Sequence, residues 1–391
     1  MLLKPLDALQ WDALGCDRVT GGVERAWIGW CSIFLELDDG RLFYIGYESP
    51  KTPASAVLCN WSTMTMSGSD DSQGKSDSSQ GKSDDSQGKW DDSQRKWDDS
   101  QGDNCRNNVS RLGKKIKDIE WGSKQSFVIT INGGVFKWTE CDFSSPPQPV
   151  HELSQSSSPS SDGSHCSTIN GAKVISVSCG TTYSCVLYSD GSAKVMEDGD
   201  EDEAIDFRLE SDSFISVSCG HEHILLLTIS GRVYVYGKGG KGQLGLGSID
   251  ENEVTDSQPR LVEALDGVPI EEVVAGGWHS LALSKEGDVY AWGWNESGQL
   301  GINKLLIPLT ATPTVIVFDE VKNWSAIAAG SRHSMAVSSD GSLYSWGWNK
   351  YGQLGLDSKL FPSVDVPKRV KLGAKVVSIN CKYWSSIIVV D

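Results

Sequence analysis

The feature that most constrains the fold of this chain is an internal repeat. The segments AGGWHSLALSKEGDVYAWGWNESGQLGI, which begins at Ala275, and AGSRHSMAVSSDGSLYSWGWNKYGQLGL, which begins at Ala329, align almost residue for residue. A third copy, CGHEHILLLTISGRVYVYGKGGKGQLGL, begins at Cys219, and four weaker copies keep only the first half of the pattern. Segments that recur at intervals of about 50 residues indicate an array of similar units rather than one irregular core.

Each copy contains two apolar runs around a glycine turn, as in Leu281–Ser284 and Val289–Trp292. This pattern predicts β-hairpins, and no copy has a helical period long enough to predict a helix. One such unit cannot bury both of its faces alone, whereas units packed in a closed ring can. The seven copies therefore predict an all-β chain, a seven-bladed β-propeller over residues 1–391 with degenerate early blades. Because the last copy is only half a repeat, we expect residues 2–14 to supply a strand beside the last blade.

Two segments interrupt the repeats. Residues 68–102 consist of heptads such as KSDDSQG and KWDDSQR, which lack the paired apolar positions of a coiled coil and predict a disordered insert. Residues 144–168 are rich in Ser and Pro and predict a second disordered loop. The third copy is shortened, and its acidic run EDGDEDE at 197–203 predicts a solvated loop.

The net charge restricts the partners. The formal net charge is −17 and there is no basic arm, so we do not expect direct DNA binding. Basic protein surfaces, such as histone segments, remain compatible with this charge. No apolar run approaches the roughly 20 residues that span a bilayer, so we expect no membrane contact. No two of the ten cysteines form a C-x-x-C pair, which favours buried thiols in a soluble intracellular protein.

Three motifs that suggest chemistry are better explained by the repeat. The string GKGGKG at 237–242 matches G-x-G-x-x-G, but QLGLG follows it and cannot begin the helix that a dinucleotide site needs. The string CGHEH at 219–223 offers zinc-ligand types, but its last histidine fills a repeated slot, which favours an imidazole hydrogen-bonded inside a blade. His279 and Ser280 are neighbours on a strand and face opposite ways, so this serine is not activated. We therefore predict no catalytic residues, no metal site and no cofactor.

The strings G-x-x-H-S and G-x-x-Y-x-W-G-x-N-x-x-G-Q-L-G, at His279–Gly301 and His333–Gly355, resemble the regulator-of-chromosome-condensation repeat. The resemblance is less close at His223–Gly245, and it covers nearly the whole chain outside the insert. It implies a seven-bladed β-propeller that acts as a protein-interaction module. Similarity to the propeller-only regulator-of-chromosome-condensation domain-containing proteins further implies a nuclear partner of a JmjC-type histone demethylase or hydroxylase, linked to histone methylation and chromosome segregation.

The variable positions between the fixed ones are the candidate binding residues. The slot two residues before the serine anchor should project from one face around the axis; it holds Trp30, Lys124, Thr182, Glu222, Trp278, Arg332 and Tyr383. Trp, Tyr and Arg predominate at the energetic centres of interfaces, so we predict partner contacts at Trp278, Arg332 and Tyr383. The alternative is that Trp278 and Tyr383 fill gaps between blades. The opposite loops offer a second candidate surface with Glu296, Lys350 and Tyr351.

The leading hypothesis is a monomeric, non-enzymatic scaffold in the nucleus or on chromosomes, with the cytoplasm as another location. Its partners would be proteins, such as a JmjC-type demethylase and histones. One alternative is guanine-nucleotide exchange on a Ran-like small GTPase, which the resemblance implies because some superfamily members have that activity. Another is a cytoplasmic adaptor or a ubiquitin-ligase substrate receptor, since a fold alone does not rank such roles.

Overall fold

The computed structural model describes residues 2–3, 23–28, 32–37, 42–46, 55–59, 116–123, 125–131, 134–139, 148–149, 168–169, 172–197, 200–250, 258–318 and 323–391. Within these ranges the chain forms seven β-sheets and one short 3₁₀ helix, η4 (Glu263–Leu265). No helix in this described part is long and apolar enough to cross a membrane.

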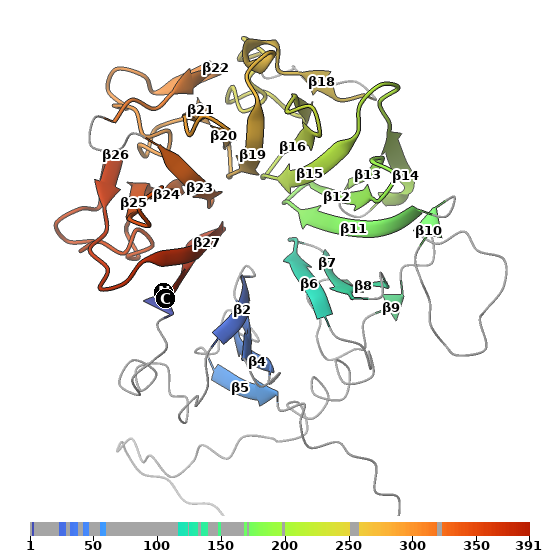
Figure 1. Ribbon diagram of the computed structural model, residues 1–391, viewed down its shortest axis with the longest axis horizontal. Helices are drawn as coiled ribbons and strands as arrows, with labels where there is room; N and C mark the ends of the chain where they lie inside the picture. Colours follow the sequence, from blue (N-terminus) through green and yellow to red (C-terminus); the bar gives the residue numbers. More distant parts are fainter. Residues whose placement is uncertain are drawn as a thin grey trace, which may run out of the picture.

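We name the sheets blades 1 to 7 in chain order, and Figure 1 labels most of their strands. Blade 1 contains β2 (Val23–Ile28), β3 (Ser32–Leu37), β4 (Leu42–Gly46) and β5 (Ser55–Cys59). Blade 2 contains β6 (Ile116–Trp121), β7 (Gln125–Thr130), β8 (Val135–Thr139) and β9 (Gln148–Pro149). Blade 3 contains β10 (Thr168–Ile169), β11 (Ala172–Cys179), β12 (Tyr183–Tyr188), β13 (Ala193–Glu197) and β14 (Asp200–Phe207).

The second half of the chain forms the more regular blades. Blade 4 contains β15 (Phe214–Cys219), β16 (His223–Thr228), β17 (Val233–Gly237) and β18 (Arg260–Leu261). Blade 5 contains β19 (Ile270–Ala275), β20 (His279–Ser284), β21 (Val289–Trp294) and β22 (Leu309–Val315). Blade 6 contains β23 (Trp324–Ala329), β24 (His333–Ser338), β25 (Leu343–Trp348) and β26 (Ser363–Arg369). Blade 7 contains β27 (Val376–Lys382), β28 (Ser385–Val390) and the N-terminal strand β1 (Leu2–Leu3).

The inner strands of the blades surround one axis (Figure 1). They contact one another in the order β2, β6, β11, β15, β19, β23 and β27, and β27 contacts β2 again, which closes the ring. Strand β1 pairs in parallel with β28, with Leu2 opposite Ile388, so the N-terminal segment completes the last blade. The predicted seven-bladed β-propeller is confirmed, and so is its closure by an N-terminal strand.

Two predicted loops differ from the structure. The solvated loop predicted at 197–203 is wrong, because Glu197 ends β13 and pairs with Asp200 at the start of β14. The third copy is short because β14 follows β13 so closely, yet blade 3 still has five strands. Inside the loop predicted at 144–168, β9 pairs with β8, and the last residue, Thr168, begins β10. Two-residue strands carry almost no sequence signal, and the insert 68–102 lies outside the described residues.

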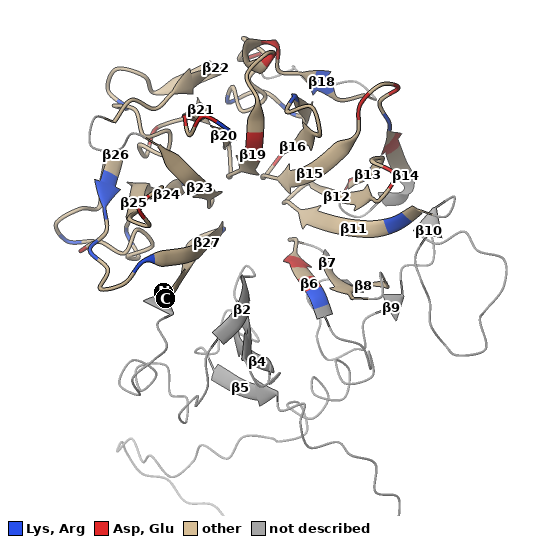
Figure 2. Ribbon diagram, viewed as in Figure 1, with Lys and Arg blue, Asp and Glu red and all other residues tan. Residues whose placement is uncertain are grey.

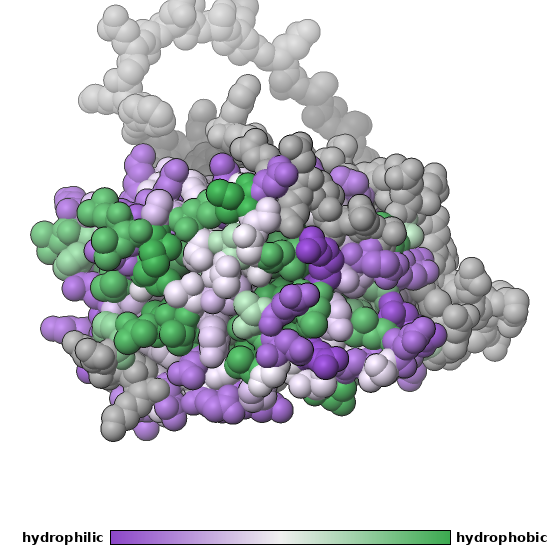
Figure 3. Space-filling view, turned by 90° about the horizontal axis from the view of Figure 1, so that it is seen from above, coloured by the Kyte–Doolittle hydropathy of each residue, from purple (hydrophilic) through white to green (hydrophobic). Residues whose placement is uncertain are grey.

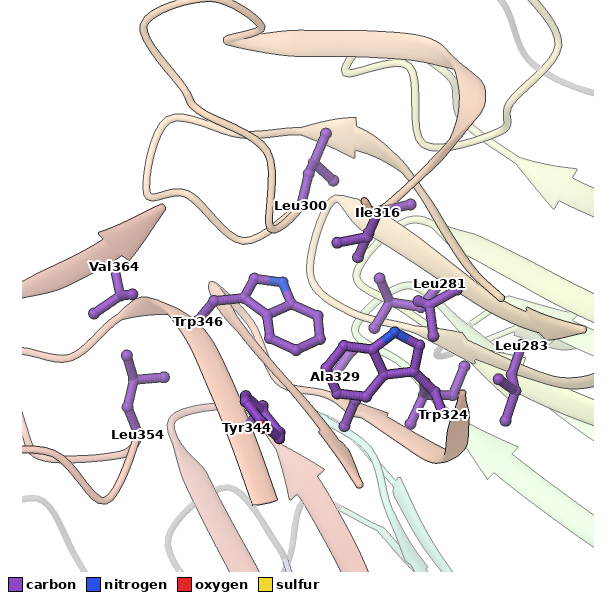
Figure 4. Close-up of a cluster of buried hydrophobic side chains, with 14 residues drawn as sticks. Leu281, Leu283, Leu300, Ile316, Trp324, Ala329, Tyr344, Trp346, Leu354 and Val364 are labelled. Carbon is purple, nitrogen blue, oxygen red and sulfur yellow. The ribbon is translucent and has the colours of Figure 1, made fainter. Parts of the chain in front are cut away.

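The hydrophobic core lies between blades rather than inside each one. Between blades 5 and 6, Leu281 and Leu283 face Trp324, Tyr344 and Trp346 (Figure 4). The second strands of blades 3 to 6, which are β12, β16, β20 and β24, are buried at every position because a neighbouring blade covers each face. Each large side chain buried in this way stabilises the ring by about 1.5–3 kcal/mol relative to an exposed one.

The fixed residues of the repeat join neighbouring blades. His279 Nε2 in blade 5 lies 2.9 Å from Ser334 Oγ in blade 6, and Ser334 donates to the carbonyl of Gln299 (2.8 Å) in blade 5. Trp346 Nε1 donates to the same carbonyl (2.9 Å). The same joint recurs on either side of this pair of blades, as His223–Ser280–Gln243 and His333–Ser386–Gln353. The prediction that these imidazoles are bonded inside one blade is wrong, since a strand buried on both faces points its side chains at its neighbours.

Candidate functional site: a partner-binding face

In each regular blade, the turn between the first and second strands leaves from the same face as the loop between the third and fourth strands. The cause is antiparallel pairing. The amide of Trp294, at the end of β21, donates to the carbonyl of Trp278, just before β20 (2.8 Å), and Trp348 donates to Arg332 in the same way (2.8 Å). We call this side of the ring the turn face.

The predicted second surface is part of the turn face. The loops that follow Trp294 and Trp348 carry Glu296, Lys350 and Tyr351, so the prediction that these residues lie on the opposite side is wrong. The sequence pattern gave the strands but not the side of the ring from which each connection leaves. All the described candidates except Tyr383 therefore belong to one surface.

Strand register identifies the residues that occupy equivalent positions on the turn face. In blades 3 to 6, the slot two residues before the start of the second-strand pairing holds Thr182, Glu222, Trp278 and Arg332, as predicted. The other two predicted members of this slot, Trp30 and Lys124, lie outside the described residues.

The predicted place of Tyr383 in this slot is wrong. In blade 7, Cys381 pairs with Ser386, so the equivalent residue is Trp384. The adjacent serines, Ser385 and Ser386, shifted the alignment by one residue. Tyr383 is buried, its backbone has a φ of 50°, and its hydroxyl donates to the carbonyl of Trp121 (3.3 Å) in blade 2. The alternative that Tyr383 fills a gap between blades describes this environment.

An arginine held between two tryptophans is the centre of the turn face. The guanidinium carbon of Arg332 lies 4.4 Å from the ring centroid of Trp294 and 5.9 Å from that of Trp348. Trp294 also meets Trp278 edge to face, with centroids 5.7 Å apart. Such cation–π contacts are worth about 0.5–2 kcal/mol each, depending on how far they are removed from water.

The same row of rings continues in both directions. Trp348 contacts Trp384 (5.1 Å) and Tyr351 (5.2 Å), and Lys350 Nζ lies 5.8 Å from the Tyr351 ring. At the other end, Trp278 packs on His221, with centroids 4.6 Å apart. We call this chain of contacts the aromatic row; its members are His221, Trp278, Trp294, Arg332, Trp348 and Trp384.

Glu222 anchors the first part of the aromatic row. Trp278 Nε1 donates to Glu222 Oε2 (3.0 Å), and Lys238 Nζ lies 3.7 Å from the other carboxylate oxygen. Glu222 is therefore already paired with two neighbours, so we assign it to holding Trp278 in place. His221 is held in turn by Thr181 Oγ1, 2.6 Å from its Nδ1, and burial lowers its pKa.

Glycine and asparagine residues fix the backbone that positions the aromatic row and the neighbouring loops. Gly293 and Gly347 both have a φ of 102°, and a Cβ there would approach the carbonyls of Trp278 (2.5 Å) and Arg332 (2.6 Å). Each W-G-W-N string therefore needs glycine between its tryptophans. The following Asn349 is buried and donates to the carbonyls of Leu356 (3.1 Å) and Phe361 (2.8 Å), which fixes the loop that carries Tyr351.

The residue types that suggest catalysis or metal binding have structural partners. Ser280 Oγ donates to the carbonyl of Gln243 (2.9 Å), so its proton is not available for transfer to the neighbouring blade's imidazole. Cys219 Sγ donates to the carbonyl of Ser178 (3.2 Å), away from the contacts made by His221 and His223. In the described part of the chain, no three His, Cys, Asp or Glu residues group closely enough to hold a metal ion.

The axis of the ring contains a cavity of about 210 Å³ lined by inner strands and glycine turns. Lys382 occupies the turn position that is glycine in the other six copies, and its Nζ lies 2.6 Å from Glu120 Oε2 in blade 2. Burial acts to lower the pKa of Lys382, but the attraction of Glu120 outweighs it and the pKa is raised. This ion pair spans from blade 7 to blade 2, past blade 1.

Sequence reasoning missed four members of the aromatic row: His221, Trp294, Trp348 and Trp384. Trp384 was missed because the register error gave its slot to Tyr383. The available signal was the glycine inside W-G-W-N: regular alternation would place both tryptophans on one side of the strand, but the glycine, with a φ of 102°, interrupts it. Accordingly, Trp292 and Trp346 are buried, while Trp294 and Trp348 remain partly exposed.

A family model described as RCC1-like domain matches residues 74–391. RCC1 domain-containing protein 1 of Homo sapiens is 34% identical over 209 residues, which cover 43% of this chain and 54% of that protein. Ultraviolet-B receptor UVR8 of Arabidopsis thaliana is 34% identical over 216 residues, which cover 50% of this chain and 47% of that protein. The chain thus spans about half the length of these curated relatives.

A solved structure supports the fold alone. A chain in the crystal structure of Kap60 bound to yeast RCC1 (Prp20) matches with a TM-score of 0.55 and 21% identity, covering 68% of this chain and 66% of that chain.

Proposed function

Since this chain belongs to the RCC1-like domain family, we propose that it is a non-enzymatic scaffold that binds a protein partner on the turn face of blades 4 to 7. The observation that carries this proposal is the aromatic row, in which partly exposed tryptophans and one arginine are held by neighbouring blades. These residue types predominate at the energetic centres of interfaces. Because the row is already ordered, little side-chain entropy is lost when a partner binds.

The first partner to test is a JmjC-type histone demethylase or hydroxylase in the nucleus. This choice follows from the similarity to RCC1 domain-containing protein 1, and with it come the proposed links to chromatin, histone methylation and chromosome segregation. The net charge of −17 fits a protein or histone partner better than naked DNA. We further propose that the propeller acts as a monomer.

Affinity capture from nuclear extract tests the proposal. The test variant is Trp278→Ala with Arg332→Ala. The matched control is Ile229→Ala with Lys285→Ala, two exposed residues that follow the second strands of blades 4 and 5, at the end away from the turn face. Truncating each hot-spot residue commonly costs at least about 2 kcal/mol, so partner recovery should fall at least about tenfold. The control should retain the partner.

Equal recovery of every captured protein by the test variant and the wild type would remove the turn face from the proposal. A second measurement addresses the exchange alternative: release of fluorescent GDP from a Ran-like GTPase. A many-fold acceleration by the purified chain would favour guanine-nucleotide exchange over a purely scaffolding role.

A further inference from the structure

We propose that Arg332 is the anchor for an acidic side chain, so that the turn face binds a protein segment in which Asp or Glu alternates with apolar residues. This inference rests on the proposed use of the turn face and names the chemistry of what binds there.

Among the described residues, Arg332 has no anionic partner. In the described part of the chain the ion pairs join other residues, and no carboxylate lies within salt-bridge distance of Arg332. Its Nε is buried and makes no hydrogen bond to any described residue. The two tryptophan rings hold the plane of the guanidinium, and a planar guanidinium accepts a carboxylate by two parallel hydrogen bonds.

The turn-face loops of blades 5 and 6, the two blades whose tryptophans hold Arg332, add further basic side chains. They carry Lys350 and Lys359, and no ion pair in the described residues includes them. The loops also carry two carboxylates without an ion pair among those residues, Glu296 and Asp357. Figure 2 shows Lys and Arg on the loop beside β25 and β26. With Arg332 these lysines outnumber the two carboxylates, and in a chain of net charge −17 such a local basic surplus attracts an acidic segment.

The same loops expose large apolar side chains. Leu305 is 85% exposed, Leu306 79%, and Leu360 and Tyr351 71% each. Figure 3 shows hydrophobic residues gathered on the side of the ring where Figure 1 places β22 and β26. A nucleic acid backbone supplies anions without aliphatic groups, whereas a peptide supplies both. The combination of an unpaired arginine and exposed leucines therefore favours an acidic, apolar protein segment.

The probe is a displayed library of random-sequence peptides selected on the full chain. Peptides retained by the wild type should be enriched several-fold in Asp and Glu, next to Leu, Ile, Val or aromatic residues. Arg332→Gln should weaken a selected peptide at least about tenfold, because truncating one partner of a close charge pair costs more than rim charges do. The matched control, Arg369→Gln, removes an exposed arginine that bonds Ser342 on the outer edge of blade 6 and should leave affinity unchanged.

Two further variants keep the test decisive if Arg332→Gln disturbs the tryptophans. Arg332→Lys keeps the charge but not the planar fork and should give an intermediate loss. Lys350→Gln, on an exposed side chain, should weaken binding a few-fold, with affinity falling as NaCl rises. Near-ultraviolet circular dichroism reports whether each variant keeps the wild-type packing.

Several outcomes overturn the proposal. The first is that the library yields neutral or basic peptides. If partner capture still depends on Trp278 and Arg332 in that case, the proposed function stands and only the acidic-segment proposal fails. Others are equal affinity of Arg332→Gln and Arg369→Gln, binding that requires phosphoserine, or a dimer of the chain that Arg332→Gln abolishes.

Discussion

At the scale of single residues, hydrogen bonding fixes the protonation of the repeated histidines. The hydroxyl proton of Ser334 goes to the carbonyl of Gln299, so His279 must donate to Ser334 from Nε2. The other nitrogen, Nδ1, is buried without a hydrogen-bond partner among the described residues and faces Gly276. His223 and His333 have the same surroundings, and burial lowers the pKa of all three to about 3.

This arrangement makes stability fall in mild acid. The folded pKa is about 3 and the unfolded value is 6.5, so the unfolded chain binds more protons between these pH values. The histidines therefore contribute their full stabilisation above pH 6.5. This contribution falls as the pH decreases toward 3, by up to about 1.4 kcal/mol per pH unit for each histidine. Burial raises the pKa of Glu272 to about 7, which works in the opposite direction and offsets part of the loss.

Urea unfolding at pH 7.5, 6.5, 5.5 and 4.5 measures this slope. His333→Gln should lower stability at pH 7.5 but reduce the slope by about one histidine's share, since one titrating group is gone. A free energy of unfolding that stays level between pH 7.5 and 5 would contradict the histidine account.

At the scale of single elements, asparagine holds the loops that present the candidate site. Asn349 makes two bonds to loop carbonyls and accepts one from the amide of Leu354 (2.9 Å). Asn349→Ala leaves these groups unpaired, and we expect a loss of about 2–3 kcal/mol together with faster hydrogen exchange at 350–362.

Asn303→Ala is the matched control for this change. Asn303 is exposed and its side chain accepts one bond, from the amide of Leu305 (3.0 Å), so the loss should stay below about 1 kcal/mol. Similar exchange rates in the two variants would show that asparagine does not order the loop.

Individual strands and turns also show which features of the structure could be predicted from the sequence. The repeats predicted the number of blades and the closing strand, because glycine turns and apolar runs survive even in the weaker copies. Burial on both faces of the second strands removed the alternation that identifies a single surface. Antiparallel order alone would have placed Lys350 and Trp278 on one face of the predicted blades. The contact of Trp294 with Arg332 depends on how two blades pack, and no pattern within one repeat identifies it.

At the scale of the whole molecule, the ring is closed by more than the pairing of β1 with β28. Lys382 and Glu120, with side chains 18% and 25% exposed, connect blade 7 to blade 2, and Tyr383 adds a hydrogen bond to Trp121. Both contacts join blade 7 directly to blade 2, although blade 1 stands between them in the order of the ring. We call this pair of contacts the closing clasp.

Removing one member of the clasp should destabilise the ring. Lys382→Met leaves the largely buried carboxylate of Glu120 without its cation, and we expect the free energy of unfolding to fall by about 2 kcal/mol. This is less than the loss for a fully buried ion pair, because both groups keep some contact with water. Lys382→Met with Glu120→Gln should recover part of this loss. Urea unfolding of the two single variants and the double variant measures the coupling. Lys371→Met, on an exposed side chain, is the control, and a loss equal to it would refute the clasp.

The repeated His–Ser joints connect blades 4 to 7. In the first three copies the position of the repeated histidine holds Ser32, Gln125 and Tyr183, and both long insertions fall in that half of the chain. The proposed binding face therefore lies on the arc of the ring that the histidine joints hold together, and both insertions fall on the opposite arc.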